Sequence, residues 1–345
     1  MLVFCRELVD LGLKVDLLTV RLEGPLSQLI PSGVSVIDLK SRRTTLALPK
    51  LVSYLRQTRP AALYSTIMNA NVVAAMARVL AGSTIPTIVR ESNAPLSSPK
   101  STVSRWVTYK VAPFLYQFAN GIIAVSQGVA DELGVMAPRI RDRIRVIPTP
   151  VVSDDVLKQG EASVDHPWFI QHDKPIILSA ARLERHKGFF TLLRAFAELR
   201  EKKDARLAIL GQGSMREQIQ DEIVRLGLQE HAALLGFAHN PFAYMSKADA
   251  FVLASEFEGL PNVLVQAMAF GTPIVATDCK SGPAEILCGG KYGTLVPVGD
   301  VHALAQGLAS ALTCPRQVEA MAHARSVYGA RNAAHEYLTM AGFVV

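Results

Sequence analysis

The stretch EFEGLPNVLVQAMAFGTPIVATDCKSGPAEIL (residues 256–287) decides the predicted fold. A short apolar strand over residues 249–254 precedes it. A helix follows Pro261, because apolar residues recur on one of its faces, and Gly271 ends that helix. A second buried strand covers residues 273–277. The stretch therefore predicts strand, helix and strand, the repeating unit of a parallel sheet covered by helices.

The start of this helix predicts an anion-binding site. Proline is tolerated in a first helical turn, so the N–H groups of Asn262, Val263 and Leu264 are expected to point out of the helix start. Free N–H groups at such a terminus favour anions. Glu258 lies just outside the helix, close enough to act on whatever the anion carries. This combination suits the diphosphate and sugar of a nucleotide sugar.

The same stretch carries the signature of a known family: Glu, seven residues, Glu, and then Ala-Met-Ala-x-Gly-x-Pro with two hydrophobic residues and Ala. The sequence has Glu258 and Gln266 at the two spaced positions, followed by Ala267–Gly271 and Pro273–Ala276. It therefore resembles the retaining glycosyltransferases of the GT-B fold, glycosyltransferase family 4 (glycosyl transferases group 1). The family's second carboxylate usually binds ribose hydroxyls. The amide of Gln266 can also accept from one hydroxyl and donate to another.

A second segment, PIILSAARLERHKGFFTLLRAFAEL (175–199), reads as strand, loop and helix. A helix dipole disfavours a cation at the helix start, yet Lys187 lies there and Arg182 lies earlier in the same loop. An anion that bridges both cations explains the pattern, whereas either residue alone would be read as a solvated surface charge. The family has Gly-Arg-Leu-x-x-x-Lys-Gly here, and residues 181–188 match it at all but the first position. The resemblance implies that Arg182 and Lys187 hold the donor diphosphate.

A third segment, LAILGQGSMREQI (207–219), is a strand followed by Gly211-x-Gly213 and a helix. Ser214 and Glu217 fit an S-x-x-E capping box. Gly213 fits either a close backbone approach to a ligand, as the family implies, or a plain turn. The next predicted strand ends in Phe237, and the resemblance alone implies that backbone groups near it hold the nucleotide base.

Strand-like runs alternate with helical runs along the whole chain, which indicates an α/β fold with parallel sheets. Two prolines in IPTPVVSDD (147–155) mark a linker. We therefore predict two Rossmann-like domains facing across a cleft (GT-B), with ligands at the carboxyl ends of the strands. The acceptor-side domain covers residues 1–150 and the nucleotide-sugar donor-binding domain covers 151–325. A helical pattern is present near 318–340. By analogy, the C-terminal segment 326–345 is expected to form a helix that crosses back to the first domain. The predicted strands are 14–20, 34–39, 62–65, 86–90, 121–125, 144–147, 176–179, 205–210, 232–235, 251–254, 274–277 and 293–296.

The charge is unevenly distributed. Residues 1–150 contain 18 Lys and Arg against 9 Asp and Glu, whereas residues 151–345 contain 18 against 21. A basic half indicates an anionic partner. No nucleic-acid recognition motif accompanies the charge, so the sequence favours the inner membrane surface and a lipid diphosphate acceptor. Trp106, Phe114 and Leu115 are nevertheless predicted to be core. The candidate contact zones are Arg42, Arg43, Arg139, Arg141, Arg143, Arg145 and SRWVTYKVAPFLYQF (104–118).

Cysteine usage and hydropathy indicate an intracellular enzyme. The four cysteines show no C-x-x-C spacing, which argues against a zinc site or a disulfide framework and for a reducing cytoplasm. The longest uncharged run, Val111–Ala130, contains Pro113 and Gly121 and does not predict a membrane span, and no signal peptide is recognisable. No Asp-x-Asp pair occurs, so neither a metal ion nor a cofactor is expected. The predicted location is the cytoplasm, with peripheral attachment to the inner face of the membrane.

Polar residues at strand ends of the first half are the candidates for the acceptor side. Glu91 and Asn93 come after a buried strand and are expected to face the cleft. Relatives place polar groups there against the transferred sugar. Asn69 and Asn71 follow the preceding strand, and Ser126 is expected to cap a helix.

The resemblance implies transfer of a hexose or N-acetylhexosamine from a nucleoside diphosphate sugar, with UDP expected, to a glycan or lipid-linked acceptor. It further implies retention of configuration and a role in cell-surface polysaccharide synthesis. Arg182, Lys187 and the helix start would stabilise the leaving diphosphate, and Glu258 would orient the sugar. A sugar-nucleotide epimerase of related fold and a catalytically silent nucleotide-sugar-binding protein stay open as alternatives. A dehydrogenase is not indicated, because Gly211-x-Gly213 lacks a third glycine.

The start of the chain departs from the doubly wound pattern. Residues 1–11 predict a helix that leads straight into the strand 14–20, whereas such domains place a strand and a glycine-rich turn before that helix. The absent strand would lie between strands 14–20 and 62–65, and its loss would leave backbone groups unpaired. We therefore expect a misplaced start or a trimmed chain with weak or no activity. Direct pairing of those two strands would contradict this expectation.

Overall fold

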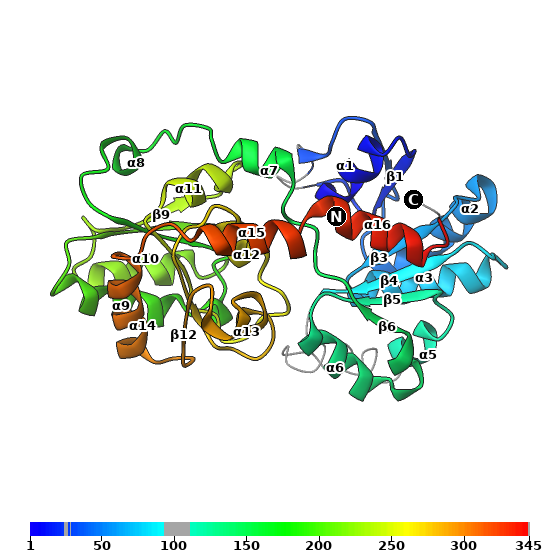
Figure 1. Cartoon of the computed structure of the whole chain (residues 1–345). Helices are drawn as coiled ribbons and strands as arrows, with labels where there is room; N and C mark the ends of the chain where they lie inside the picture. Colours follow the sequence, from blue (N-terminus) through cyan, green and yellow to red (C-terminus); the bar gives the residue numbers. More distant parts are fainter. Residues whose placement is uncertain (24–26, 28, 93–110, 344–345) are drawn as a thin grey trace. The chain divides into compact units, whose positions relative to one another are not determined.

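The computed structural model describes residues 1–23, 27, 29–92 and 111–343, which form two compact α/β units (Figure 1). Unit 1 comprises Met1–Pro150 and Ala330–Val345, and unit 2 comprises Val151–Gly329. The first boundary falls after Pro150, where the proline-rich linker was predicted. The second falls after Gly329 rather than after residue 325.

Unit 1 contains two parallel sheets. β1 pairs with β2, and a separate sheet has the strand order β3-β4-β5-β6. In the described part of the chain, β1 does not pair with β3. Direct pairing of these two strands would have contradicted the expectation about the start of the chain. That expectation itself stays a prediction. The strands are β1 (Val15–Thr19), β2 (Val34–Asp38), β3 (Leu63–Thr66), β4 (Thr87–Glu91), β5 (Gly121–Ala124) and β6 (Ile144–Val146).

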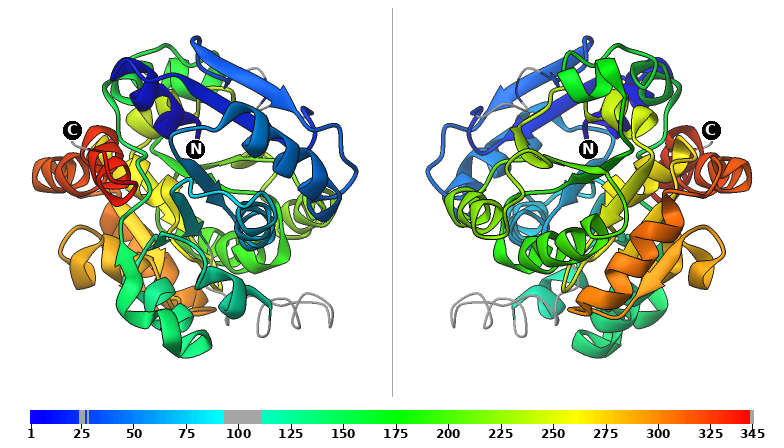
Figure 2. Two further views of the ribbon diagram at one scale, coloured as in Figure 1. Left: turned by 90° about the vertical axis from the view of Figure 1, so that its right-hand side faces the viewer. Right: turned by 90° about the vertical axis from the view of Figure 1, so that its left-hand side faces the viewer.

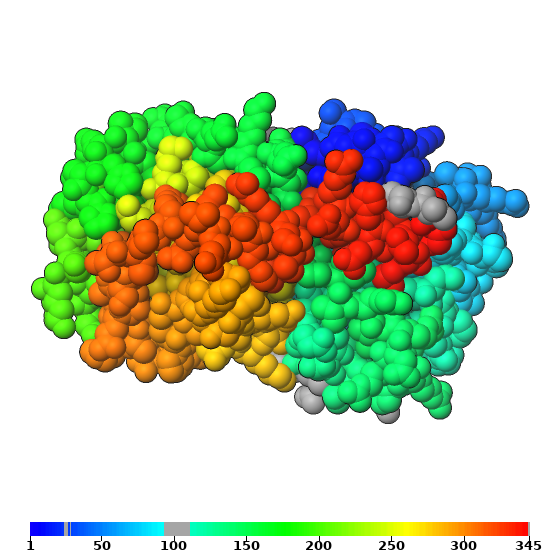
Figure 3. All heavy atoms as spheres, viewed as in Figure 1, coloured from blue at the N-terminus to red at the C-terminus, as the bar shows by residue number. Residues whose placement is uncertain are grey.

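Helices cover both faces of the four-stranded sheet. On one side, α1 and α16 contribute Phe4 and Tyr337 to a core that also holds Ile88 and Ile123 from the sheet. Figure 3 shows α16 beside α1 at the surface, in agreement with their contacts. On the other side, α3, α5 and α6 form a second core with the same sheet. The helical segments are α1 (Leu2–Asp10), η2 (Thr44–Ala47), α2 (Leu48–Thr58), α3 (Met68–Leu80), α5 (Ala112–Tyr116), α6 (Gln127–Met136), η4 (Pro138–Arg143) and α16 (Ala330–Met340).

Unit 2 is built on one six-stranded parallel sheet with the order β12-β11-β10-β7-β8-β9. Its central strands are apolar runs that are fully buried, because helices cover both faces. α9 and α14 lie side by side on one face (Figure 2). The strands are β7 (Ile176–Ala180), β8 (Arg206–Leu210), β9 (Ala232–Gly236), β10 (Ala250–Leu253), β11 (Ile274–Thr277) and β12 (Thr294–Val296). The helical segments are α7 (Asp154–Gln159), α8 (Pro167–Gln171), η5 (Arg185–Lys187), α9 (Phe189–Arg200), α10 (Arg216–Arg225), α11 (Pro241–Lys247), α12 (Asn262–Ala269), α13 (Pro283–Ile286), η6 (Cys288–Gly290), α14 (Val301–Ala311) and α15 (Val318–Val327).

The α/β fold class with two parallel-sheet domains is confirmed, and each predicted strand is present within one or two residues of its predicted bounds. The helical pattern near 318–340 is two helices, α15 in unit 2 and α16 in unit 1, so the prediction of one continuous helix was wrong. α16 lies within the predicted range 326–345 and belongs to unit 1, the unit of the first domain, as expected. Ser126 caps α6 as predicted, since its Oγ accepts from the N–H of Val129 at 3.3 Å.

The predicted core assignment in the stretch 104–118 is only partly correct. Leu115 packs against the core of unit 1. Phe114 is 59% exposed and lies edge-to-face with Phe118, so its assignment to the core was wrong. α5 is only five residues long and turns one apolar face outward. Trp106 lies outside the described residues.

Candidate functional site

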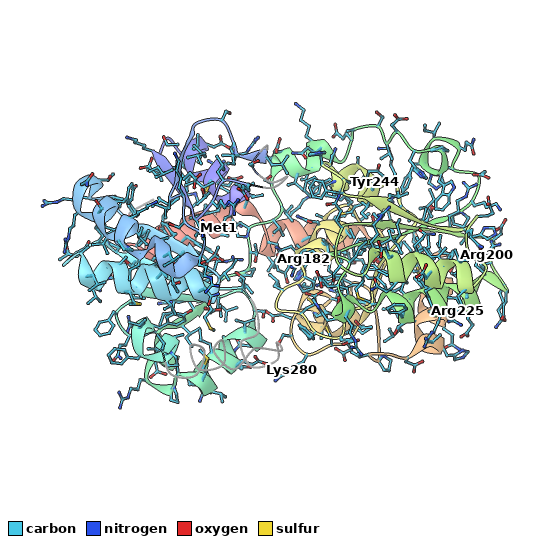
Figure 4. All side chains as sticks on the ribbon, turned by 180° about the vertical axis from the view of Figure 1, so that it is seen from behind. Met1, Arg182, Arg200, Arg225, Tyr244 and Lys280 are labelled. Atoms are coloured by element: carbon cyan, nitrogen blue, oxygen red, sulfur yellow. The ribbon has the colours of Figure 1, made fainter. Side chains whose placement is uncertain are left out.

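The predicted donor-site residues gather at the carboxyl ends of the strands of unit 2, where parallel α/β sheets bind ligands. The loops after β7, β8, β9, β10 and β11 all reach this edge, because parallel strands end on the same side. Figure 4 shows Arg182 and Lys280 at this edge, away from Arg200 and Arg225 at the opposite end of unit 2.

An ion pair between Lys187 and Glu258 lies at the centre of this edge. The Nζ of Lys187 is 2.5 Å from Oε1 of Glu258, and the two side chains are only 13% and 11% exposed. The hydroxyl of Ser255, two residues beyond the end of β10, donates to the same oxygen at 2.7 Å. Thr277 at the end of β11 in turn donates to the carbonyl of Ser255 at 2.6 Å. Both bonds to Glu258 end on Oε1, which leaves Oε2 to accept from another donor.

Gly188 makes this ion pair possible, because it lets the η5 turn touch the end of β10. Gly188 has φ +67°, a left-handed conformation that favours glycine, and a Cβ there would lie 1.9 Å from the carbonyl oxygen of Ala254. The N–H of Glu256 donates to the carbonyl of His186 at 2.8 Å and holds the two loops together. The His186 and Phe257 rings stack at 4.5 Å across the same contact.

Charges of both signs surround this turn, since Arg182, Arg185 and Lys187 lie in the same segment as Glu184, and Lys187 pairs with Glu258. Arg182 is exposed and forms no ion pair within the described ranges. The pKa of His186 is lowered, first by burial and then by the charge of Lys187, whereas Glu258 acts in the opposite direction. The lowered pKa favours the neutral form of His186, and Arg182 and Arg185 are the exposed cations of this segment.

The start of α12 differs in one respect from the prediction. Pro261 is the N-cap residue, and Asn262 and Val263 begin the helix. The N–H of Leu264 donates to the carbonyl of Pro261 at 2.9 Å, so it is not free for an anion, and that part of the prediction was wrong. The half-buried side chain of Gln266 lies one turn further along.

Gly213 is explained by packing between loops. A Cβ at Gly213 would lie 2.4 Å from the carbonyl oxygen of Leu183, so glycine is required where the loop after β8 crosses the loop that carries Arg182. The predicted capping box was wrong. α10 begins after Met215 with no side-chain cap, and Ser214 instead donates to Glu184 at 3.3 Å. Phe237 follows β9 on this edge, half-buried, with its ring edge-on to His239.

Sequence reasoning missed two residues of this site, Ser255 and Cys279. Cys279 is buried, and burial, with a smaller contribution from Glu258, raises the pKa of its thiol to about 12. Ser255 directly follows one predicted strand and Cys279 lies two residues beyond the next, at the edge where ligands are expected, and that position is the signal that could have identified them.

The two acceptor-side candidates belong to unit 1. Glu91 is 2% exposed, and its Oε1 accepts from the hydroxyl of Tyr116 and from Nδ2 of Asn71 at 2.9 Å. Its carboxylate therefore lies inside unit 1 and not at the surface that was predicted. A buried carboxylate needs such donors, which lie on α3 and α5 and are distant in sequence. Asn93 lies outside the described residues.

No group of three or more His, Cys, Asp and Glu that could hold a metal ion is found over the described ranges. The prediction that no metal takes part is not tested by this and stays a prediction. In the same part of the chain, no helix combines the length and the apolar character needed to cross a bilayer.

The fold is that of GT-B glycosyltransferases of known structure. A crystal structure of HepE from Anabaena in complex with UDP and glucose superposes with a TM-score of 0.79 at 22% identity, covering 99% of this chain and 95% of that one. A glycosyltransferase from Rickettsia africae gives 0.77 at 16% identity, covering 98% and 92%.

Family models and relatives agree with this fold. Residues 1–155 match the Glycosyltransferase Family 4 model and residues 164–327 match Glycosyl transferases group 1, so the chain belongs to the family 4 type of glycosyltransferases. One relative is the N-acetylgalactosamine-N,N'-diacetylbacillosaminyl-diphospho-undecaprenol 4-alpha-N-acetylgalactosaminyltransferase of Campylobacter jejuni, 31% identical over 70% of this chain and 64% of its own length. Another is a lipopolysaccharide core biosynthesis glycosyltransferase of Rhizobium meliloti, 27% identical over 60% and 58%. The chain thus spans about half to two thirds of the length of the curated relatives it matches.

Proposed function

We propose that the chain transfers a hexose or N-acetylhexosamine from a UDP-sugar to a glycan or lipid-linked acceptor, with retention of configuration, in cell-surface polysaccharide synthesis. The observation that carries this proposal is the Lys187–Glu258 pair beside the start of α12, with Arg182 exposed in the same loop cluster. UDP is supported by its presence in the complexes of HepE. The lipid-linked acceptor is supported by the name of the C. jejuni relative.

The chemistry follows from the charges. Arg182 and Lys187 neutralise the leaving diphosphate, and the N–H groups of Asn262 and Val263 add two donors at the positive end of the helix dipole. When the diphosphate engages Lys187, Glu258 loses a partner, and its oxygens can accept from sugar hydroxyls. Oε2, which is not used by Lys187 or Ser255, is the oxygen best suited to hold the ring from the start. Two cations and a helix start supply the charge that a metal ion supplies elsewhere, so the proposal includes no metal.

The site is tested by binding and turnover together. UDP should raise the melting temperature of the chain, since a ligand that binds only the folded state stabilises it. Release of UDP from UDP-sugars should depend on a lipid-linked glycan acceptor, and nuclear magnetic resonance should show the α configuration in the product. Conversion of one UDP-sugar into another without an acceptor would instead identify an epimerase. Tight UDP-sugar binding without transfer to any acceptor would identify a silent binding protein.

We also propose that unit 1 attaches peripherally to an anionic membrane surface. Phe114 and Phe118 are 59% and 36% exposed and lie edge-to-face, and Arg143 donates to the carbonyl of Gln117, next to Phe118, at 3.0 Å. Exposed apolar side chains beside arginines suit a membrane interface. The protein should sediment together with anionic vesicles, and this co-sedimentation should be lost at high salt and weakened by Phe114→Ser. Equal co-sedimentation with neutral vesicles would contradict the proposal.

A further inference from the structure

The guanidinium of Arg90 is buried in unit 1, with no carboxylate partner among the residues that the structure describes. Arg90, on β4, is 6% exposed. Its Nη1 donates to the hydroxyls of Thr66 and Ser92, both at 3.0 Å, and its Nη2 donates to the hydroxyl of Thr149. Its Nε has no hydrogen-bond partner in the described part of the chain. Neutral hydroxyls do not balance the charge, and a buried, unbalanced cation is costly to the fold unless an anion joins it.

The hydroxyl of Tyr337, on α16, lies beside the buried guanidinium. It is buried and makes no well-aligned hydrogen bond among the residues that the structure describes. Burial raises the pKa of Tyr337, and the charge and the nearby N–H groups of Arg90 partly offset this effect, which places the two groups close together.

The start of α3 lies directly beside this charge. Thr66, which accepts from Arg90, is the last residue of β3, and only Ile67 separates it from α3. α3 is 13 residues long and its N-cap makes no side-chain hydrogen bond. The N–H groups of its first turn, at Met68, Asn69 and Ala70, thus lack a cap, and the helix dipole adds positive potential at the same place.

Together these groups have the chemistry of a phosphate site. A phosphate offers several oxygens to a guanidinium fork, to helix N–H groups and to hydroxyl donors at once. The hydroxyls of Thr66 and Ser92, 2.8 Å apart, can each turn to donate to it. We propose that Arg90 and the start of α3 bind the phosphate of a diphosphate-bearing acceptor. The identity of the ligand in this inference rests on the proposed function, whereas the site itself rests on the geometry of unit 1.

The proposal is tested by titrating the full chain with inorganic pyrophosphate and with farnesyl diphosphate, measured by calorimetry. The Arg182→Ala/Lys187→Ala background removes the donor cations in unit 2 and isolates the site in unit 1. Binding should persist in that background and weaken about tenfold or more when Arg90→Gln is added, the scale of a lost charged hydrogen bond. Tighter binding of farnesyl diphosphate than of pyrophosphate identifies a lipid diphosphate, and equal binding identifies a soluble phosphate group.

Two further variants keep the test independent of folding. Asn69→Asp places a carboxylate in the first turn of α3, where it favours the helix but repels a bound anion, so it should weaken pyrophosphate binding without lowering the melting temperature. Arg56→Gln is the matched control in unit 1, because Arg56 donates to the backbone carbonyl of Leu80 at 2.7 Å, and it should leave binding unchanged. The proposal would be overturned if pyrophosphate binding disappeared in the Arg182→Ala/Lys187→Ala background. It would also be overturned if neither Arg90→Gln nor Asn69→Asp changed the affinity for pyrophosphate. UDP binding that survives Arg90→Gln shows that the donor site is separate.

Discussion

Lys187→Ala and Arg182→Ala, compared side by side, separate the chemical role of the donor loop from its role in folding. The Nζ of Lys187 is 2.5 Å from Oε1 of Glu258, in a pair that is largely shielded from water. Lys187→Ala therefore removes the positive charge that stabilises the leaving diphosphate. It also leaves the carboxylate of Glu258 with one partner fewer. Arg182 is exposed and has no ion pair in the described ranges, so Arg182→Ala removes the diphosphate contact alone.

The expected magnitudes follow from these contacts. Each variant should lose about 2–4 kcal/mol of transition-state stabilisation, which is about 30- to 1,000-fold in turnover. Lys187→Ala should in addition lower the free energy of unfolding by about 1–3 kcal/mol, the cost of leaving a shielded polar group unsatisfied. Arg182→Ala should leave the free energy of unfolding unchanged within about 0.5 kcal/mol. Adding Glu258→Gln to Lys187→Ala should recover part of the lost stability, because a neutral amide is cheaper to bury than a carboxylate.

The assays are UDP release at saturating donor and equilibrium unfolding in urea. Near-normal turnover in both single variants would refute the assignment of the donor site. Loss of turnover with equal loss of stability in both variants would refute the distinction between a paired lysine and a free arginine.

Four further outcomes are expected. Gly188→Ala should destabilise the chain by about 2 kcal/mol or more, from the positive φ and the clash with the end of β10, as urea unfolding will show. Gln266→Glu should keep most activity while Gln266→Ala raises the KM for the donor, and an unchanged KM would make the position structural. Activity should survive chelation by EDTA, and strict dependence on manganese or magnesium would contradict the metal-free proposal. Burial raises the pKa of the Cys279 thiol to about 12, so the thiol is protonated at pH 8 and should resist iodoacetamide at that pH. The exposed Cys288 and Cys314 should react first, as mass spectrometry of the modified protein will show.

The sequence was sufficient for features that depend on neighbours along the chain. Apolar runs located strands such as β5, β7 and β10, which are buried along their whole length, because a strand buried on both faces needs consecutive apolar residues. The cap at Ser126 and the end of the helix at Gly271 follow from groups a few residues apart. The motifs around Glu258 and Lys187 were visible for the same reason, and they identified the carboxyl edge of the second sheet.

Tertiary structure alone decided which groups meet across that edge. Lys187 and Glu258 are 71 residues apart, and no local pattern predicts that they form an ion pair. The burial of Glu91 depends on donors from α3 and α5, so its position after a strand suggested an exposed role that the fold does not give it. The sequence places Arg90 beside Glu91 at a polar strand end of the acceptor side, but only the fold shows that its guanidinium is buried among neutral hydroxyls. Local preferences are set within a few residues, whereas burial and the pairing of charges depend on the segments that the fold brings together.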